Sequence, residues 1–458
     1  MSAARGSKAG RVVYRCTGCG QSQPKWSGQC GGCGQWNTLV EEIEAPAVGR
    51  RRAGYAGAAE GSMPVSLAEV SREDLSRVTS GLGELDRVLG GGVVPGSAIL
   101  LGGDPGIGKS TLLLQTLAYL GKSARTLYVT GEESLSQVSL RAHRLGLDGH
   151  GIQALAETSL ERILDTAERH KPEVLVVDSI QTVYSEALQS APGSVGQVRE
   201  CAAQLVRYAK QSSTTVFLVG HVTKEGALAG PRVLEHMVDT VLYFEGDASS
   251  RYRVVRSFKN RFGAVNELGV FAMTETGLKE VRNPSAIFLS RGDEDMPGSI
   301  VTVTREGSRP LLVEVQALVD ESHLQSPRRL VVGMEMNRLA MLLAVLHRHG
   351  GVPVVAQDVF VNLVGGVRLT ETAGDLAIAC AVVSSFRDRP VPGEWVIFGE
   401  LGLNGEIRPV PNGEERLREA AKHGFKYALV PAKNAPKQGV PGVSIIAARN
   451  LREAINAL

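Results

Sequence analysis

The sequence predicts an α/β protein whose largest part is a mainly parallel β-sheet covered by helices. Short apolar runs alternate with helix-like stretches between residues 78 and 279. The runs are continuous rather than alternating, which is typical of strands buried on both faces. They are residues 97–101, 126–130, 174–177, 215–219 and 241–244, and the clearest helices between them are 110–120 and 195–210. Strands that alternate with helices predict an open, helix-covered parallel sheet.

Length and composition predict a globular chain of several domains. With 458 residues, the chain is long enough for two or three domains, and 43% hydrophobic with 21% charged residues is an ordinary globular balance. No apolar run reaches about 18 residues, and the basic N-terminus lacks the apolar segment of a secretory signal. We therefore expect no membrane partner and a cytoplasmic location. The net charge of +2 identifies no partner.

Changes in composition divide the chain into four segments. Residues 11–40 contain two CxxC pairs, and residues 41–75, rich in Ala, Gly and Arg, form a linker. Residues 76–282 carry the β/α alternation, and a break near Asn283 and Pro284 opens a second α/β domain, 283–458. In that domain we expect strands at 299–304, 311–318 and 395–398 and helices at 338–349 and 372–385.

Four of the six cysteines lie within 18 residues and predict a metal site. Cys16 and Cys19 form one CxxC pair, and Cys30 and Cys33 form the second. Glycines around each pair allow tight turns that direct four thiolates at one tetrahedral centre. Structural Zn²⁺ is the expected metal, with an iron–sulfur centre as the alternative, and a unit this small needs it to fold. Cys201 and Cys380 fall on helix-like stretches and are interpreted as core residues.

A complete phosphate-binding loop lies between an apolar strand and a helix. Residues 103–110 match GxxxxGK[ST] in full. The glycines let backbone N–H groups surround phosphates, and the start of the helix adds its positive end. Lys109 is expected to bridge the β- and γ-phosphates of ATP, and Ser110 to bind Mg²⁺. The predicted nucleotide-binding residues are Gly103, Asp104, Pro105, Gly106, Ile107, Gly108, Lys109, Ser110 and Thr111.

Three strand ends supply the remaining groups for ATP hydrolysis. Asp178 ends a buried strand and is the expected second Mg²⁺ anchor. Glu132 and Glu133 follow strand 126–130, which we place beside the P-loop strand, so either could act as catalytic base, with Glu132 preferred. His221 lies at the end of strand 215–220 and either senses the γ-phosphate or is an ordinary hydrogen-bonded histidine.

Residues 79–92 with 95–97 resemble the entry segment of RecA-superfamily ATPases. The motif Lys259-Asn260-Arg261-Phe262-Gly263, between the four-cysteine module and the second α/β domain, resembles the bacterial RadA (Sms) family of DNA repair proteins over the whole chain. The resemblance implies a homo-hexameric ring that binds single-stranded DNA, hydrolyses ATP and promotes branch migration of recombination intermediates together with the RecA recombinase. It also implies that Lys259 and Arg261, after strand 252–258, reach a neighbouring subunit's γ-phosphate; alone, the motif reads as a solvated basic turn.

In RecA-like cores two segments face the central channel, and here they correspond to residues 182–196 and 222–232. Both carry Gly or Pro and few apolar residues, so they are interpreted as mobile loops. Lys224 and Arg232 are candidate phosphate contacts.

The second α/β domain resembles the proteolytic domain of Lon proteases, chiefly at 372–385 and 399–409. Lon chemistry needs a serine activated by a lysine. The serine position falls at or beside Ala373, Gly374 and Asp375, and the lysine position falls at Glu414, so neither catalytic type is kept. We therefore expect a non-proteolytic platform for ring assembly and DNA contact, through Arg305, Arg309, Arg328 or Arg329. An ATP-dependent protease and a DNA-independent signalling ATPase are the rival functions.

Overall fold

A computed structural model of the chain describes residues 11–16, 22–23, 25–44, 76–221, 231–246, 251–281, 283–289, 295–323, 326–366 and 368–458. The chain divides into two compact units, Met1–Ser71 and Arg72–Leu458, and each is considered by itself. Among the described residues no helix is long and apolar enough to cross a membrane.

The first unit contains a small antiparallel sheet of three strands, β1 (Arg11–Cys16), β2 (Ser22–Gln23) and β3 (Leu39–Glu44), in the order β2-β1-β3. Its small core contains Cys30 and Leu39, with Tyr14 packed against them.

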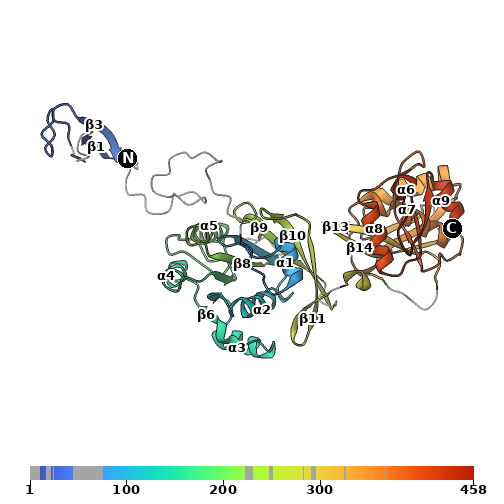
Figure 1. The fold of residues 1–458 in the computed structure, drawn as a ribbon, viewed down its shortest axis with the longest axis horizontal. Helices are drawn as coiled ribbons and strands as arrows, with labels where there is room; N and C mark the ends of the chain where they lie inside the picture. The colour runs from blue at the N-terminus through green and yellow to red at the C-terminus, as the bar shows by residue number, and fades with distance from the viewer. Residues whose placement is uncertain are drawn as a thin grey trace. The chain divides into compact units, whose positions relative to one another are not determined.

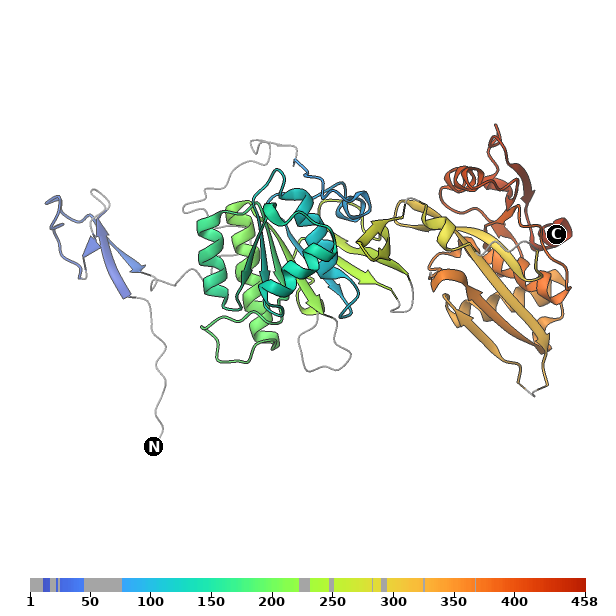
Figure 2. The same ribbon diagram turned by 90° about the horizontal axis from the view of Figure 1, so that it is seen from below.

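The larger unit begins with a nine-stranded sheet that confirms the expected mainly parallel architecture (Figures 1 and 2). Its order is β12-β11-β10-β9-β4-β8-β7-β5-β6, parallel from β9 to β6 and antiparallel from β9 to β12. The parallel strands are β4 (Ala98–Gly103), β5 (Thr126–Thr130), β6 (Ile152–Ala156), β7 (Val174–Asp178), β8 (Thr215–His221) and β9 (Thr240–Glu245). The antiparallel strands are β10 (Tyr252–Asn260), β11 (Leu268–Thr274) and β12 (Gly277–Glu280).

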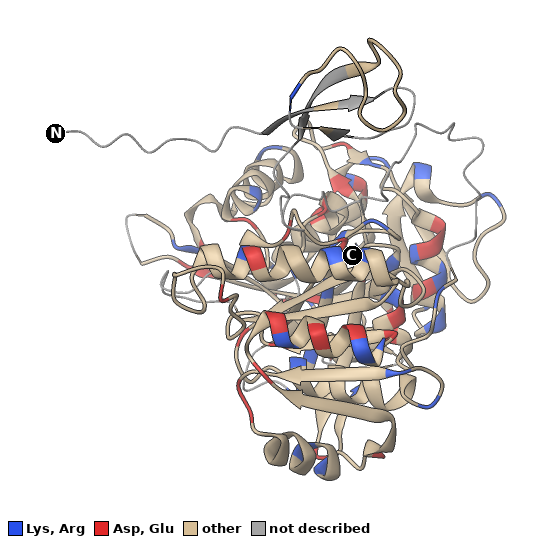
Figure 3. Ribbon diagram, turned by 90° about the vertical axis from the view of Figure 1, so that its left-hand side faces the viewer, with Lys and Arg blue, Asp and Glu red and all other residues tan. Residues whose placement is uncertain are grey.

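Helices cover both faces of this sheet because its strands are apolar on both sides. Leu100 of β4 packs into the cluster under α4 and α5, while Ile99 and Leu101 pack into the cluster under α1 and α2. Cys201 of α5 is fully buried, which confirms its interpretation as a core residue. The helices are α1 (Gly83–Leu89), α2 (Lys109–Leu120), α3 (Leu135–Arg144), α4 (Leu160–His170) and α5 (Val195–Ser212). Figure 3 shows Lys and Arg interspersed with Asp and Glu along exposed helices.

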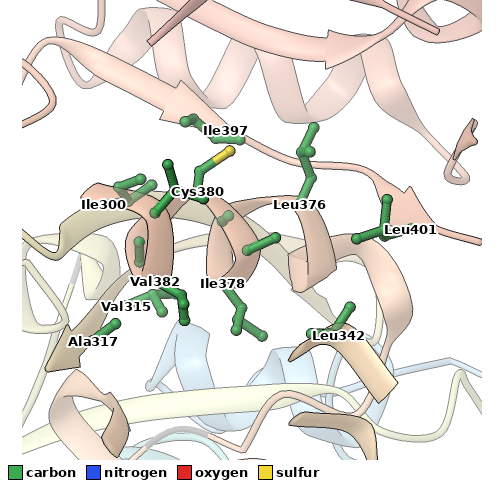
Figure 4. Close-up of a cluster of buried hydrophobic side chains, with 14 of the residues drawn as sticks. Ile300, Val315, Ala317, Leu342, Leu376, Ile378, Cys380, Val382, Ile397 and Leu401 are labelled. Atoms are coloured by element: carbon green, nitrogen blue, oxygen red, sulfur yellow. The ribbon is translucent and has the colours of Figure 1, made fainter. Parts of the chain in front are cut away.

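The C-terminal half is built on a second, mixed sheet of seven strands in the order β15-β16-β14-β13-β17-β20-β21. Helix α7 (Asp375–Phe386) is apolar on all sides and packs between this sheet and α6 (Met336–Val345), as a helix without a polar face must (Figure 4). Cys380 lies in this core with no exposed surface, as expected. The strands are β13 (Ser299–Glu306), β14 (Arg309–Glu321), β15 (Arg329–Val332), β16 (Gln357–Leu363), β17 (Trp395–Ile397), β20 (Tyr427–Pro431) and β21 (Ser444–Ala448); the other helices are α8 (Gly413–Lys422) and α9 (Leu451–Ala457).

The hairpin of β13 and β14 links the second sheet to the first through hydrogen bonds and ion pairs. Arg309 donates to both carboxylate oxygens of Glu84 on α1, at 3.0 and 2.8 Å, and Ser308 N–H donates to Glu267 at 2.8 Å. Arg256 of β10 pairs with Glu306. Since Arg309 is thus committed to an internal ion pair, it is a poor candidate for the DNA contact expected from the sequence. Arg305, paired with Glu415 at 3.1 Å, is constrained in the same way.

Candidate functional site: the carboxyl edge of the parallel sheet

The P-loop is the backbone turn from the end of β4 to the start of α2. Gly103, Gly106 and Gly108 all have positive φ angles, of 155°, 74° and 118°. A Cβ on Gly103 would lie 2.6 Å from the carbonyl oxygen of Phe244, so a side chain there is excluded by backbone as well as by conformation. Asp104, Pro105 and Gly106 are exposed at the mouth of the loop, with Ser110 and Thr111 half-buried behind them. This is the cradle that the motif predicts.

Lys109 is buried at the base of the loop. Its Nζ donates to the carbonyls of Gly103 at 2.7 Å and Asp104 at 2.8 Å, and it lies 3.1 Å from Nδ1 of His221. Burial lowers the pKa of Lys109 to about 8, although nearby carboxylates, Asp178 foremost, oppose the shift. The ammonium is thus held where it can exchange carbonyl oxygens for phosphate oxygens.

Asp178 ends β7 and is held by a neighbouring strand. Tyr128 of β5, itself 1% exposed, donates its hydroxyl to Asp178 Oδ2 at 2.6 Å. Burial and the adjacent carboxylate raise the pKa of Tyr128, so the hydroxyl remains a donor. One carboxylate oxygen is fixed by this bond, which orients the other oxygen as a hard ligand of the kind that Mg²⁺ prefers.

The two glutamates after β5 have different surroundings. Glu133 forms an ion pair with Arg141 of α3. Glu132 instead accepts from Ser179 Oγ at 2.5 Å and lies 3.2 Å from His221 Nε2. His221 and Ser179 lower the pKa of Glu132 to about 2, although its partial burial opposes the shift. Only Glu132 therefore joins the group around Lys109.

His221 bridges Lys109 and Glu132. Because a charged Lys109 can only donate, Nδ1 of His221 accepts and the ring proton is assigned to Nε2. Nε2 is close to Glu132, yet its N–H direction is not that of a formed hydrogen bond, so we treat the contact as electrostatic. The sequence leaves open whether His221 is an ordinary strand-end histidine, and the structure places it inside the site.

The strand order corrects one expectation. The sequence predicts strand β5 beside the P-loop strand, but the neighbours of β4 are β8 and β9, with β8 and β7 lying between β4 and β5. Glu132 reaches the site because the turn after β5 extends across the carboxyl ends of these intervening strands to Ser179 and His221. Strand order in a parallel sheet depends on crossover connections, which an apolar pattern does not encode.

The KNRFG motif lies near the amino ends of the parallel strands, whereas the P-loop lies at their carboxyl ends. In register, Asn260 pairs with Thr240 and Thr240 with Ile99 at the start of β4, whereas Gly103 pairs with Phe244 at its end. Lys259 and Asn260 belong to β10 rather than to a following turn. The site at the carboxyl edge is therefore built without Lys259 or Arg261 of the same chain.

The motif is also more ordered than a solvated basic turn. Lys259 Nζ donates to the carbonyls of Glu235 and Val238, both at 2.8 Å, and burial lowers its pKa. Arg261 lies 3.3 Å from Asp239, but 58% of its side chain is exposed. A Cβ on Gly263 would lie 2.7 Å from the Cα of Gly90, which explains why the motif ends in glycine. Arg261 is the cation of the motif that faces solvent.

In the first unit the second cysteine pair forms a tight turn. Gly34 N–H donates to the Cys30 carbonyl at 2.9 Å, and Gly32 N–H lies 3.4 Å from Cys30 Sγ. An N–H directed at a sulfur stabilises a thiolate, so this turn fits a metal knuckle. Cys19 and the side chain of Cys16 lie outside the described residues, and the four-ligand set stays a prediction.

In the C-terminal domain the positions aligned with Lon catalysis hold no nucleophile–lysine pair. Ala373 and Asp375 are each 1% exposed. Asp375 forms a bidentate pair with Arg338, and burial raises the pKa of Asp375. Glu414 pairs with Arg418 one turn along α8.

Hydrogen bonds from α5 reach part of one of the two expected channel loops, residues 182–196. Gln197 donates its amide to the carbonyls of Ser185, Leu188 and Ser190, at 2.9 to 3.2 Å. Polar groups supplied from a helix thus replace the apolar contacts that the sequence lacks. Lys224 and most of the second segment lie outside the described residues.

The sequence does not reveal the residues that contact and orient the carboxylates of the site. Tyr128 donates to Asp178, and Ser179 donates to Glu132. Arg141 forms an ion pair with Glu133 and so keeps it away from Lys109. Tyr128 carries the one available signal, a polar hydroxyl in the otherwise apolar strand 126–130. Ser179 and Arg141 carry none.

A P-loop at the carboxyl edge of a parallel sheet, with a carboxylate at the end of another strand of the same sheet, defines a P-loop ATPase. In agreement, residues 66–227 match the family model of an AAA domain. Residues 14–41 match a rubredoxin metal binding domain, and 338–434 match subunit ChlI of Mg-chelatase.

Over its whole length the chain is similar to curated bacterial relatives, each described as DNA repair protein RadA. Identity is 62% to that of Pseudomonas aeruginosa, over 99% of both chains, and 58% to that of Escherichia coli, over 98% of this chain and 99% of the relative. It is 49% to that of Bacillus subtilis, over 96% and 97%. The chain belongs to the RadA family of DNA repair proteins.

Proposed function

We propose that the protein is a DNA-dependent ATPase of recombinational repair that moves along single-stranded DNA as a homo-hexameric ring and promotes branch migration with the RecA recombinase. The observation that carries the proposal is the group formed by Lys109, His221 and Glu132 beside Asp178. A protein that only binds nucleotide needs no carboxylate beside the phosphate-binding lysine, whereas hydrolysis needs one to orient the attacking water.

Residues Gly103 to Thr111 bind the nucleotide in this proposal. Their backbone N–H groups surround the phosphates, and Lys109 moves from the Gly103 and Asp104 carbonyls to phosphate oxygens. Ser110 and Asp178 hold Mg²⁺, which neutralises phosphate charge when bound.

Glu132 orients the attacking water. A pKa of about 2 makes Glu132 a weak proton acceptor but keeps it ionised, so its main role is to fix the water by accepting a hydrogen bond. His221 contacts both Glu132 and Lys109 and so links the γ-phosphate position to the water position.

Lys259 and Arg261 act on the nucleotide of the adjacent subunit. Their place at the opposite edge of the sheet supports contact in trans, because the same chain's P-loop lies at the other end of β4. A cation from a neighbour stabilises charge on the transferring phosphoryl group, so its loss lowers turnover more than nucleotide binding.

Mixing inactive subunits tests the trans contact. Arg261→Ala and Lys109→Ala subunits are each expected to be inactive, but a mixed ring contains interfaces that pair an intact P-loop with an intact arginine. ATPase activity should therefore return in part. Mixed rings that form and show no recovery at any ratio would rule out the trans role.

The remaining segments serve assembly and DNA contact. We propose that residues 11–40 are a module that binds one Zn²⁺ through Cys16, Cys19, Cys30 and Cys33, 41–75 a linker, 76–282 the ATPase core and 283–458 a non-proteolytic platform. The buried Asp375 pair and the Glu414 pair support the loss of protease function. Zinc content near one ion per chain, lost in Cys30→Ser with an unchanged ATPase core, tests the metal.

The activity itself is tested by measuring ATP hydrolysis with and without single-stranded DNA, with casein digestion assayed on the same preparation. We expect DNA to stimulate hydrolysis and casein to stay intact. Equal rates with and without DNA would favour the signalling ATPase, and ATP-dependent casein loss would favour the protease.

A further inference from the structure

A buried arginine behind the P-loop has no part in the mechanism above. Arg253 is the second residue of β10, two strands away from β4, and is only 7% exposed. It shares the side of β10 that buries Val255, within the apolar cluster that includes Ile107 and Phe244. Placing a guanidinium in such surroundings is costly unless its N–H groups are satisfied by directed acceptors.

One of those acceptors belongs to the P-loop. Arg253 Nε donates to the carbonyl oxygen of Ile107 at 3.2 Å, and Nη1 donates to the carbonyl of Tyr252 at 2.9 Å. The chain makes room for this side chain, since a Cβ on Gly246 would lie 2.9 Å from Cδ of Arg253.

The Ile107 carbonyl matters because it shares a peptide plane with the N–H of Gly108. In a trans peptide the C=O and N–H bonds point in opposite directions, so fixing the oxygen on one side fixes the direction of the N–H on the other. Gly108 has a φ of 118° and, as a glycine, has no side chain with which to hold that plane. Lys109 fixes the Gly103 and Asp104 carbonyls, but not this one.

We propose that Arg253 is a positioning residue for nucleotide binding: through the Ile107 carbonyl it holds the Gly108 N–H toward the phosphates. Arg253 reaches no phosphate itself. The inference rests on the proposed ATP site, and it assigns that site a support from a strand outside the P-loop motif.

The role predicts a particular kinetic signature for Arg253→Met, which keeps the side-chain length but removes the donor and the charge. The Kd for fluorescent ADP and for a slowly hydrolysed ATP analogue should rise about 10- to 100-fold. At saturating ATP, kcat should fall less than threefold, because Glu132, His221 and Asp178 are untouched. Arg253→Lys, which keeps the charge and one possible donor, should recover part of the affinity.

The matched control is Arg251→Met, the same change two residues earlier on an exposed side chain. It should leave the Kd within twofold of the parent protein. Circular dichroism and melting without nucleotide establish that each variant is folded; if Arg253→Met does not fold, Arg253→Lys carries the test.

A folded Arg253 variant with parental nucleotide affinity would overturn the inference. So would a loss confined to kcat. A parent protein that binds no nucleotide would instead refute the proposed ATPase site, and Lys109→Ala, measured in parallel, separates these two failures.

Discussion

The ATPase core and the C-terminal domain both bury charged side chains, but they use them differently. In the core, Lys109, Glu132 and Asp178 meet at the carboxyl edge of the parallel sheet, where their partners include the Tyr128 hydroxyl and the His221 imidazole. Among the described residues of the C-terminal domain, the buried cation is paired with a carboxylate. Arg416, with no exposed surface, binds both oxygens of Glu371 at 2.7 and 2.6 Å and also the Val303 carbonyl.

This difference separates chemistry from architecture. A cation held by carbonyls and an imidazole can exchange them for phosphate, while the N–H groups of Arg416 are already directed at a carboxylate and at backbone carbonyls. The Arg416–Glu371 pair therefore stabilises the C-terminal domain.

Loss of the charged side chains at the nucleotide site should remove ATPase activity while the protein stays folded. Lys109→Ala should abolish measurable ATP turnover and weaken nucleotide binding, because no other ammonium faces the loop among the described contacts. Glu132→Gln should keep binding and lower kcat at least about 100-fold. Steady-state ATPase and nucleotide titration measure both.

The matched control is Glu133→Gln, the same change one residue along the chain. Because Glu133 pairs with Arg141, turnover should stay within a few-fold of the parent protein. A larger loss for Glu133→Gln than for Glu132→Gln would reverse the assignment of the two carboxylates.

Loss of a buried, carboxylate-paired arginine should instead lower stability without changing nucleotide affinity. Arg416→Met leaves Glu371 without its bidentate partner and should destabilise the C-terminal domain by about 3 to 5 kcal/mol, with nucleotide affinity unchanged. Differential scanning calorimetry measures the first quantity and titration the second. On the same helix, Arg418→Met removes an exposed pair with Glu414 and should cost under about 0.5 kcal/mol; equal costs for both variants would contradict the comparison.

The open site should also respond to pH. Lys109, with a pKa of about 8, loses its proton as pH rises through that value, and phosphate binding needs the charged form. Nucleotide affinity should therefore be about tenfold weaker at pH 9 than at pH 7. Glu132 stays ionised over this range because its pKa is lowered to about 2, so it adds no slope. An affinity independent of pH in titrations at constant ionic strength would show that Lys109 remains charged.

The smallest effect concerns the hydroxyl behind Asp178. Tyr128→Phe removes the donor to Oδ2 and should raise the Mg²⁺ concentration for half-maximal ATPase about threefold to tenfold, while kcat at saturating Mg²⁺ changes little. Tyr208→Phe is the control, since it removes a buried hydroxyl that donates to the Ala167 carbonyl far from the P-loop in the fold. The same Mg²⁺ shift in both variants would mean a general loss of stability.

The sequence by itself determined the parallel sheet, the P-loop and the placement of Asp178 and His221 at strand ends. These features are local: an apolar run of about five residues, or glycines at fixed spacing, has the same meaning wherever the chain folds it. The family resemblance rested on motifs of the same kind, read along the whole chain.

Tertiary structure alone decided which of these groups meet. Glu132 and Glu133 are adjacent in sequence but have different partners. Ser179 donates to Glu132, whereas Arg141 of α3 pairs with Glu133. Strand order placed β8 and β7 between β5 and β4, and the antiparallel register of β10 on β9 placed the KNRFG motif near the amino end of β4. Contacts between residues distant in the chain depend on crossovers and packing, and neither leaves a periodic trace in the sequence.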